Sequence, residues 1–155
     1  MKTALASIIL LISSSFALAS ENSRRYEVYR GRIGVGTPRG AICELLILSS
    51  GRDFNGTSFY KTKLAKGTRL TNKGELIPMF EQEFDLFQHG STLQGSARLV
   101  TKKGIPLKGT VSFFTDPRSN LYKAILHENT LNSSSSVGRF TVCDNMALAK
   151  VADSE

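Results

Sequence analysis

The sequence predicts an all-β protein, an antiparallel meander of about eight strands that closes into a small barrel. Two observations support this fold class. Turn signals recur at a nearly even spacing of about 14 to 18 residues, and the segments between them are as long as the longer strands of globular proteins. Closure is favoured because it removes the exposed edges of a meander. A two-sheet β-sandwich is the alternative. The turn signals lie at 36–40, 55–56, 71–74, 89–91, 102–104, 116–120 and 132–136.

The segments between these turns have the composition and patterning of strands. Residues 41–48 form an apolar run with the single charge of Glu44, residues 111–115 are β-branched and aromatic, and residues 139–143 alternate polar and apolar side chains. The predicted strands are 25–35, 41–49, 57–70, 75–87, 92–101, 105–115, 121–130 and 137–144.

One short helix is an alternative at two places. In residues 76–87 the apolar side chains recur at helical spacing, whereas Glu81, Glu83 and Asp85 alternate with apolar residues as in a strand. The even spacing of the surrounding turns favours a strand there. A second possible helix covers residues 145–151.

The first 19 residues predict a secretory signal peptide. Lys2 supplies the positive charge, residues 4–11 form a mainly apolar stretch, and Ala17-Leu18-Ala19 forms a small-residue cleavage pattern. The apolar run is shorter than the roughly 20 residues of a membrane anchor. We therefore expect cleavage before Ser20, a single β-rich domain over residues 20–155, no transmembrane segment, and a secreted or periplasmic location.

Charge and composition narrow the possible partners. The formal net charge of +7 falls to +6 when Lys2 leaves with the signal peptide, which favours an acidic protein or an anionic polysaccharide. Arginines near Tyr26 and Tyr29 are candidate contacts for an anionic partner, namely Arg24, Arg25, Arg30 and Arg32. The barrel interior could also hold an apolar small ligand or be packed solid. Its expected lining is Leu45, Ile47, Phe84, Leu86, Leu99, Val111, Phe113 and Phe140.

The two cysteines, Cys43 and Cys143, predict one disulfide in an exported chain. In a simple closed barrel the first strand would lie between them and separate them by about 9.6 Å. A disulfide needs Cα atoms within about 7 Å. The bridge therefore requires cysteines at strand ends, a first strand that does not separate them, or a sheet that is not a simple closed barrel.

Signals for catalysis, metals and cofactors are weak. No G-x-S-x-G motif occurs, and His89 and His127 lack metal-ligand spacing with Asp85 or Glu128. We expect no cofactor and no metal. The acids at 81, 83 and 85 could serve polysaccharide hydrolysis or bind a hard cation, but a solvated strand face has the same pattern. Glycosylation sequons begin at Asn55 and Asn132.

Residues 48–54, Leu-Ser-Ser-Gly-Arg-Asp-Phe, resemble the Ser-Gly-x-x-Tyr loop of bacterial periplasmic lysozyme inhibitors, which are small β-barrels. Phe54 stands where that loop has tyrosine, so the hydroxyl is missing. The resemblance implies inhibition of a secreted hydrolase. From the residues as a whole we expect a non-catalytic β-barrel that binds a ligand or protein partner outside the cytoplasm. Hydrolase inhibition is the alternative, and polysaccharide hydrolysis is a third, less favoured one.

Overall fold

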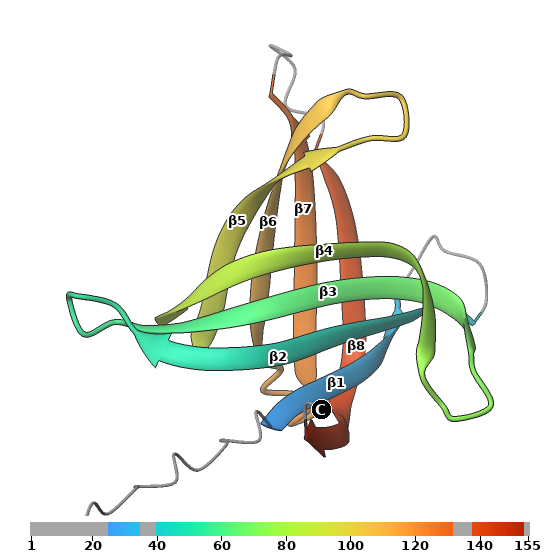
Figure 1. Ribbon diagram of the computed structural model, residues 1–155, viewed down its shortest axis with the longest axis horizontal. Coiled ribbons are helices and arrows are strands. Elements are labelled where there is room, and N and C mark those ends of the chain that lie inside the picture. The colour runs from blue at the N-terminus through green and yellow to red at the C-terminus, as the bar shows by residue number, and fades with distance from the viewer. Residues whose placement is uncertain (1–24, 35–39, 132–137, 154–155) are drawn as a thin grey trace, which may run out of the picture.

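The computed structural model describes residues 25–34, 40–131 and 138–153, and these form one closed antiparallel barrel in the order β1 to β8 (Figure 1). The all-β barrel prediction is confirmed, and the described residues contain no helix, hence none that could cross a membrane. The predicted signal peptide lies outside the described residues. The strands are β1 (Arg25–Ile33), β2 (Ile42–Arg52), β3 (Ser58–Leu70), β4 (Leu76–His89), β5 (Thr92–Val100), β6 (Pro106–Thr115), β7 (Tyr122–Thr130) and β8 (Arg139–Asp153).

The barrel consists of two halves that cross steeply. In Figure 1, β2, β3 and β4 run across the view, whereas β5 to β8 run close to vertical behind them. The halves join firmly where β1 pairs with β8 over most of its length. They join sparsely where β4 meets β5, because only three residue pairs next to the connecting turn are in register, from Phe87–Gln94 to His89–Thr92. Beyond this short ladder β4 and β5 diverge.

Alternating side chains of all eight strands point inward and fill the barrel. The expected interior residues Leu45, Phe84 and Val111 are buried in one continuous cluster, so the middle of the barrel is packed. Phe140 does not belong to this cluster. Its neighbour Thr141 faces inward and is buried, so Phe140 points outward and is 64% exposed, stacked on the ring of His127. The expectation that Phe140 lines the interior is therefore wrong.

Both segments that could have been short helices are strands. In β4, Phe80 and Phe84 face the interior, whereas Glu81 and Glu83 face outward. The helical spacing was ambiguous because residues four apart lie on one face of a strand as well as on one face of a helix. The eighth strand was expected to end at 144, but it continues to Asp153. Asn145 adopts a positive φ of 52°, and the β1–β8 register shifts between Arg30 and Arg32. This irregularity lets Met146 enter the core and the strand continue.

The predicted disulfide joins Cys43 and Cys143, whose Cα atoms are 6.1 Å apart. Cys43 is the second residue of β2 and pairs with Gly31 of β1, while Cys143 pairs with Ile33 on the other side of β1. A Cβ at Gly31 would lie 2.6 Å from Cγ of Met146. Of the three explanations considered above, the position at a strand end holds for Cys43, which lies at the start of β2. Gly31 of β1 lies between the two cysteine-bearing strands and has no side chain, which leaves room for the disulfide to join β2 and β8. The bridge suggests an oxidising compartment.

We predict that replacing both cysteines with alanine lowers the free energy of unfolding by about 2–5 kcal/mol. The bridge closes a loop with a sequence separation of 100 residues, and it restricts the unfolded chain. Urea denaturation of the double variant and of the oxidised wild type measures the loss, and the reduced wild type serves as a second comparison. Equal stability of the oxidised and reduced wild type would contradict this role of the bridge.

Candidate functional site

One end of the barrel is closed by aromatic side chains. This closed end carries the β2–β3, β4–β5 and β6–β7 turns. Phe113 and Tyr122 stack with ring centroids 5.0 Å apart, and Tyr29 packs edge-on against both at 5.2 and 4.8 Å. The Tyr29 hydroxyl donates to Glu27 at 2.8 Å. Burial and this neighbouring carboxylate raise the pKa of Tyr29 above its ordinary value. These three rings pack against the buried core and close the interior at this end among the described residues.

Among the described residues, the opposite end of the barrel is open. It carries the connections β1–β2, β3–β4, β5–β6 and β7–β8, and the separation of β4 from β5 widens it. Two adjoining pockets here share Lys66, Phe80 and Arg139. We call these two pockets together the mouth. The lining residues that decide its chemistry are Lys66, Phe80, Leu99, Leu107, Glu128, Arg139 and Thr141.

Lys66 is the more buried of the two cations that line the mouth, and the strand register explains why it points inward. It pairs with Cys43 of β2 and with Phe80 of β4, both of which belong to the interior face, and paired residues share a face. Its Nζ lies 4.3 Å from the centroid of the Phe80 ring and donates to Oγ1 of Thr141 at 3.5 Å. Burial lowers the pKa of Lys66 below its ordinary value of 10.5.

Two further charges come from β7 and β8. Glu128 and Arg139 pair across these strands and continue the inward faces that begin with Leu126 and Thr141. The carboxylate of Glu128 acts to raise the pKa of Lys66 and Arg139 acts to lower it, but both effects are smaller than that of burial. Lys66 forms no ion pair with a described carboxylate. The mouth therefore has an excess positive charge above an apolar floor.

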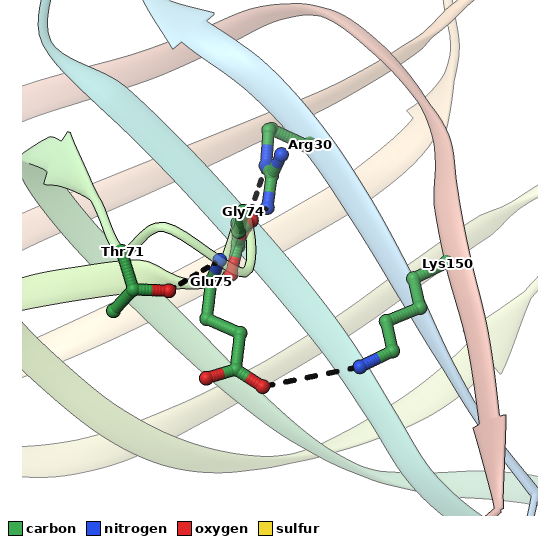
Figure 2. Close-up of polar contacts among 6 residues, drawn as sticks. Arg30, Thr71, Gly74, Glu75 and Lys150 are labelled. Atoms are coloured by element: carbon green, nitrogen blue, oxygen red, sulfur yellow. Dashed lines mark hydrogen bonds and ion pairs between the residues drawn. The ribbon is translucent and has the colours of Figure 1, made fainter.

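A second polar cluster lies on the outer wall (Figure 2). Arg30 donates from Nε to Oε1 of Glu44 at 2.6 Å and from Nη2 to the carbonyl of Gly74 at 2.6 Å. Glu44 is only 6% exposed. In the same turn the Glu75 amide donates to Oγ1 of Thr71, and the Glu75 carboxylate lies 4.0 Å from Nζ of Lys150. These contacts hold the β3–β4 turn against the outside of the barrel.

This cluster changes the interpretation of the candidate arginines. Arg30 is engaged by Glu44 and Gly74, whereas Arg32 is exposed at the end of β1. Arg25 pairs with Asp153 in the β1–β8 ladder, and Arg24 lies outside the described residues. Of the four candidate arginines, the structure describes the side chains of Arg30 and Arg32. Contact between the candidate arginines and an anionic partner stays a prediction.

The acids of β4 share one exposed outer face, as a solvated strand would. Glu81 lies 2.7 Å from Nζ of Lys63, and Asp85 lies 3.8 Å from Nζ of Lys61. The histidines are not brought together: His89 precedes the β4–β5 turn at the closed end, and His127 pairs with Phe140 at the start of β8. Among the described residues, no group of three metal-ligating side chains is placed to hold a metal ion.

The β2–β3 turn at the closed end displays an aromatic side chain. Phe54 is 97% exposed at its tip. Oδ1 of Asp53 accepts the amides of Asn55 and Thr57 at 2.9 and 2.8 Å, and its carbonyl accepts the amide of Gly56 at 3.0 Å. Gly56 takes the positive φ of 81° that the turn requires. The sequon at Asn55 is therefore on an exposed turn, whereas that at 132 lies outside the described residues.

Comparison of the chain with protein-family models, with curated proteins and with solved structures found no match. The mouth therefore has to be interpreted from its own chemistry. Lys66 and Arg139 are not among the site residues predicted from the sequence, and Glu128 was considered there only as a metal ligand. The sequence held one signal for Lys66. Thr62 and Leu64 are buried, and the next residue on the same face of the strand is the charged Lys66.

We predict that Lys66→Met is more stable than the wild type at neutral pH, because it removes a buried charge. The lowered pKa of Lys66 means that, as pH rises towards 10.5, the folded state loses its proton before the unfolded state does. Wild-type stability therefore rises relative to the variant over this range. Urea denaturation between pH 7 and 11 measures the difference. The exposed Lys61→Met is the control, and a gap that widens with pH would contradict the assignment.

Proposed function

We propose that this protein is an exported, non-catalytic binding protein whose mouth takes the anionic head group and part of the apolar chain of a small amphiphile. The observation that carries the proposal is the position of Lys66: half-buried, directed into the open end, and without an ion-pair partner among the described residues. The predicted signal peptide and the disulfide support a secreted or periplasmic location.

The charge of Lys66 explains the preference for an anion. Burying a cation without a counter-charge is costly, and a bound carboxylate would supply both the missing charge and a charge-assisted hydrogen bond. Arg139 adds a second positive charge, and the hydroxyl of Thr141 offers a polar contact. Glu128 opposes an anion from one side of the mouth, which would direct the head group towards Lys66.

The apolar floor explains the second part of the ligand. Phe80, Leu99 and Leu107 line the mouth beneath these charges, and each methylene buried against such a surface contributes about 0.8 kcal/mol. Below them the packed core begins with Phe84 and Leu126. A ligand can thus bury a short stretch of chain but cannot pass through the barrel. This architecture favours small amphiphiles over long ligands that need a hollow interior.

We predict that decanoate binds more tightly than decanol, and decanol more tightly than decyltrimethylammonium, in isothermal titration calorimetry below micellar concentrations. Affinity should rise about fourfold per methylene from hexanoate upwards, and stop rising when the mouth is filled. Lys66→Met should weaken decanoate binding by about 10- to 100-fold, the value of a hydrogen bond to a charged group.

Lys61→Met is the matched control for this experiment. It removes the same charge from the same strand, but Lys61 lies on the outer face with its side chain 61% exposed. Decanoate affinity should be unchanged in this variant. Equal affinity for the three head groups, or equal losses in the two variants, would contradict the proposal.

A second candidate function is inhibition of a secreted hydrolase through the β2–β3 turn. Support comes from the exposure of Phe54 on a turn held by its own hydrogen bonds, because a preorganised aromatic anchor loses little entropy on binding a protein pocket. The resemblance of residues 48–54 to the loop of periplasmic lysozyme inhibitors points to the same class of partner.

We predict for this second function that the protein slows cell-wall hydrolysis by a secreted lysozyme. Phe54→Ala should weaken the inhibition by at least about 30-fold, as the loss of an interface hot spot does, and Phe54→Tyr should retain it. Lys66→Met serves as the control at the opposite end of the barrel. Undiminished inhibition by Phe54→Ala, or no inhibition by the wild type, would exclude this use of the turn.

A further inference from the structure

Exposed apolar side chains surround the mouth. Met79 lines it beside Phe80 and is 75% exposed, and Val100 lines it beside Leu99 and is 70% exposed. Ile105, in the β5–β6 turn, and Leu131, whose amide approaches the carbonyl of Pro106, are exposed close by. We call Met79, Val100, Ile105 and Leu131 the apolar rim. Scattered exposed apolar residues are ordinary, but a group around a binding pocket marks an interaction surface.

The charges next to the apolar rim are mostly basic. Lys102 and Lys103 are exposed in the β5–β6 turn between Val100 and Ile105, and Arg139 is exposed across the mouth. The carboxylate that lines the mouth, Glu128, lies inside it and is partly covered. The acids of β4 lie on the outer wall, where Glu81 and Asp85 are engaged by lysines of β3.

We infer that the open end docks on the surface of an anionic phospholipid bilayer, with the apolar rim in the head-group region and the mouth facing the lipids. Apolar side chains interleaved with lysines suit this interface, since the former enter the head-group boundary and the latter are attracted to anionic lipids. An acidic soluble protein would complement the charge of the lysines, but it would not explain why the side chains of the apolar rim are hydrophobic.

This inference rests on the proposed function, because docking would place the mouth where single-chain amphiphiles are concentrated. An amphiphile could pass from the bilayer into the mouth without exposing its chain to water. Lys66 would meet the head group at the level of the lipid surface, and the packed core would limit entry to the outer part of the chain. The same open end would therefore both locate the ligand and bind it.

The test is co-sedimentation with vesicles of phosphatidylcholine alone and of phosphatidylcholine with 30% phosphatidylglycerol. We expect binding to the anionic vesicles that weakens at high salt. The Lys102→Gln/Lys103→Gln variant should bind them about 20- to 30-fold less tightly. Val100→Ser/Ile105→Ser should also lose at least about tenfold. Phe54→Ser is the control, because it removes an exposed aromatic from the closed end.

The outcomes separate the two levels of the proposal. Decanoate binding in solution without vesicle binding would overturn the docking inference and leave the proposed function standing. Vesicle binding that depends on the rim, without decanoate binding, would support docking and overturn the ligand proposal. Equal binding to both kinds of vesicle, or an equal loss in Phe54→Ser, would overturn docking. Retention on immobilised heparin that requires Lys102 and Lys103, with no vesicle binding, would instead assign the surface to a soluble acidic polymer.

Discussion

The closure of β1 onto β8 is the constraint on which the rest of this structure depends. An open meander of eight strands would expose two edges, and the β1–β8 ladder removes both. The disulfide holds that junction where β1 offers Gly31, a residue without a side chain, between β2 and β8. The disulfide and the long β1–β8 ladder stabilise this side of the barrel, so β4 and β5 on the opposite side can separate without opening the barrel. There β4 and β5 share three residue pairs, and the mouth opens at that separation.

The strand pattern could be predicted from turns and alternation because each is a local property. Asn55-Gly56 and Asp116-Pro117 mark turns whatever the rest of the chain does, and strand lengths follow from the spacing between them. The continuation of β8 past Asn145 could not be predicted in this way. It depends on a register shift against β1 and on a positive φ at Asn145, both of which are set by a strand more than 100 residues earlier in the sequence.

The mouth was not predicted, for a related reason. Lys66, Glu128 and Arg139 lie on three strands, and each looks like an ordinary surface charge in its own segment. What distinguishes them is that the face they occupy is the inner one, which is known only once Cys43, Leu126 and Thr141 are seen to be buried beside them. Arg30 shows the converse. Its sequence neighbourhood suggested a free cation, but cross-strand pairing brings it to Glu44, and the folded-back turn brings it to Gly74.

The middle of the barrel and its two ends contribute differently to stability and to the candidate functions. The packed interior and the bridge supply stability, and this stability can tolerate the cost of keeping Lys66 half-buried without an ion-pair partner among the described residues. A side chain that lowers the stability of the fold in this way is typical of a functional site, where its charge serves binding or catalysis. The open end concentrates that charge with exposed apolar side chains, whereas the closed end combines an aromatic seal with the projecting Phe54. Because these ends are separated by a packed core, a variant at one end should leave the other intact. The two candidate functions can therefore be tested independently in one protein.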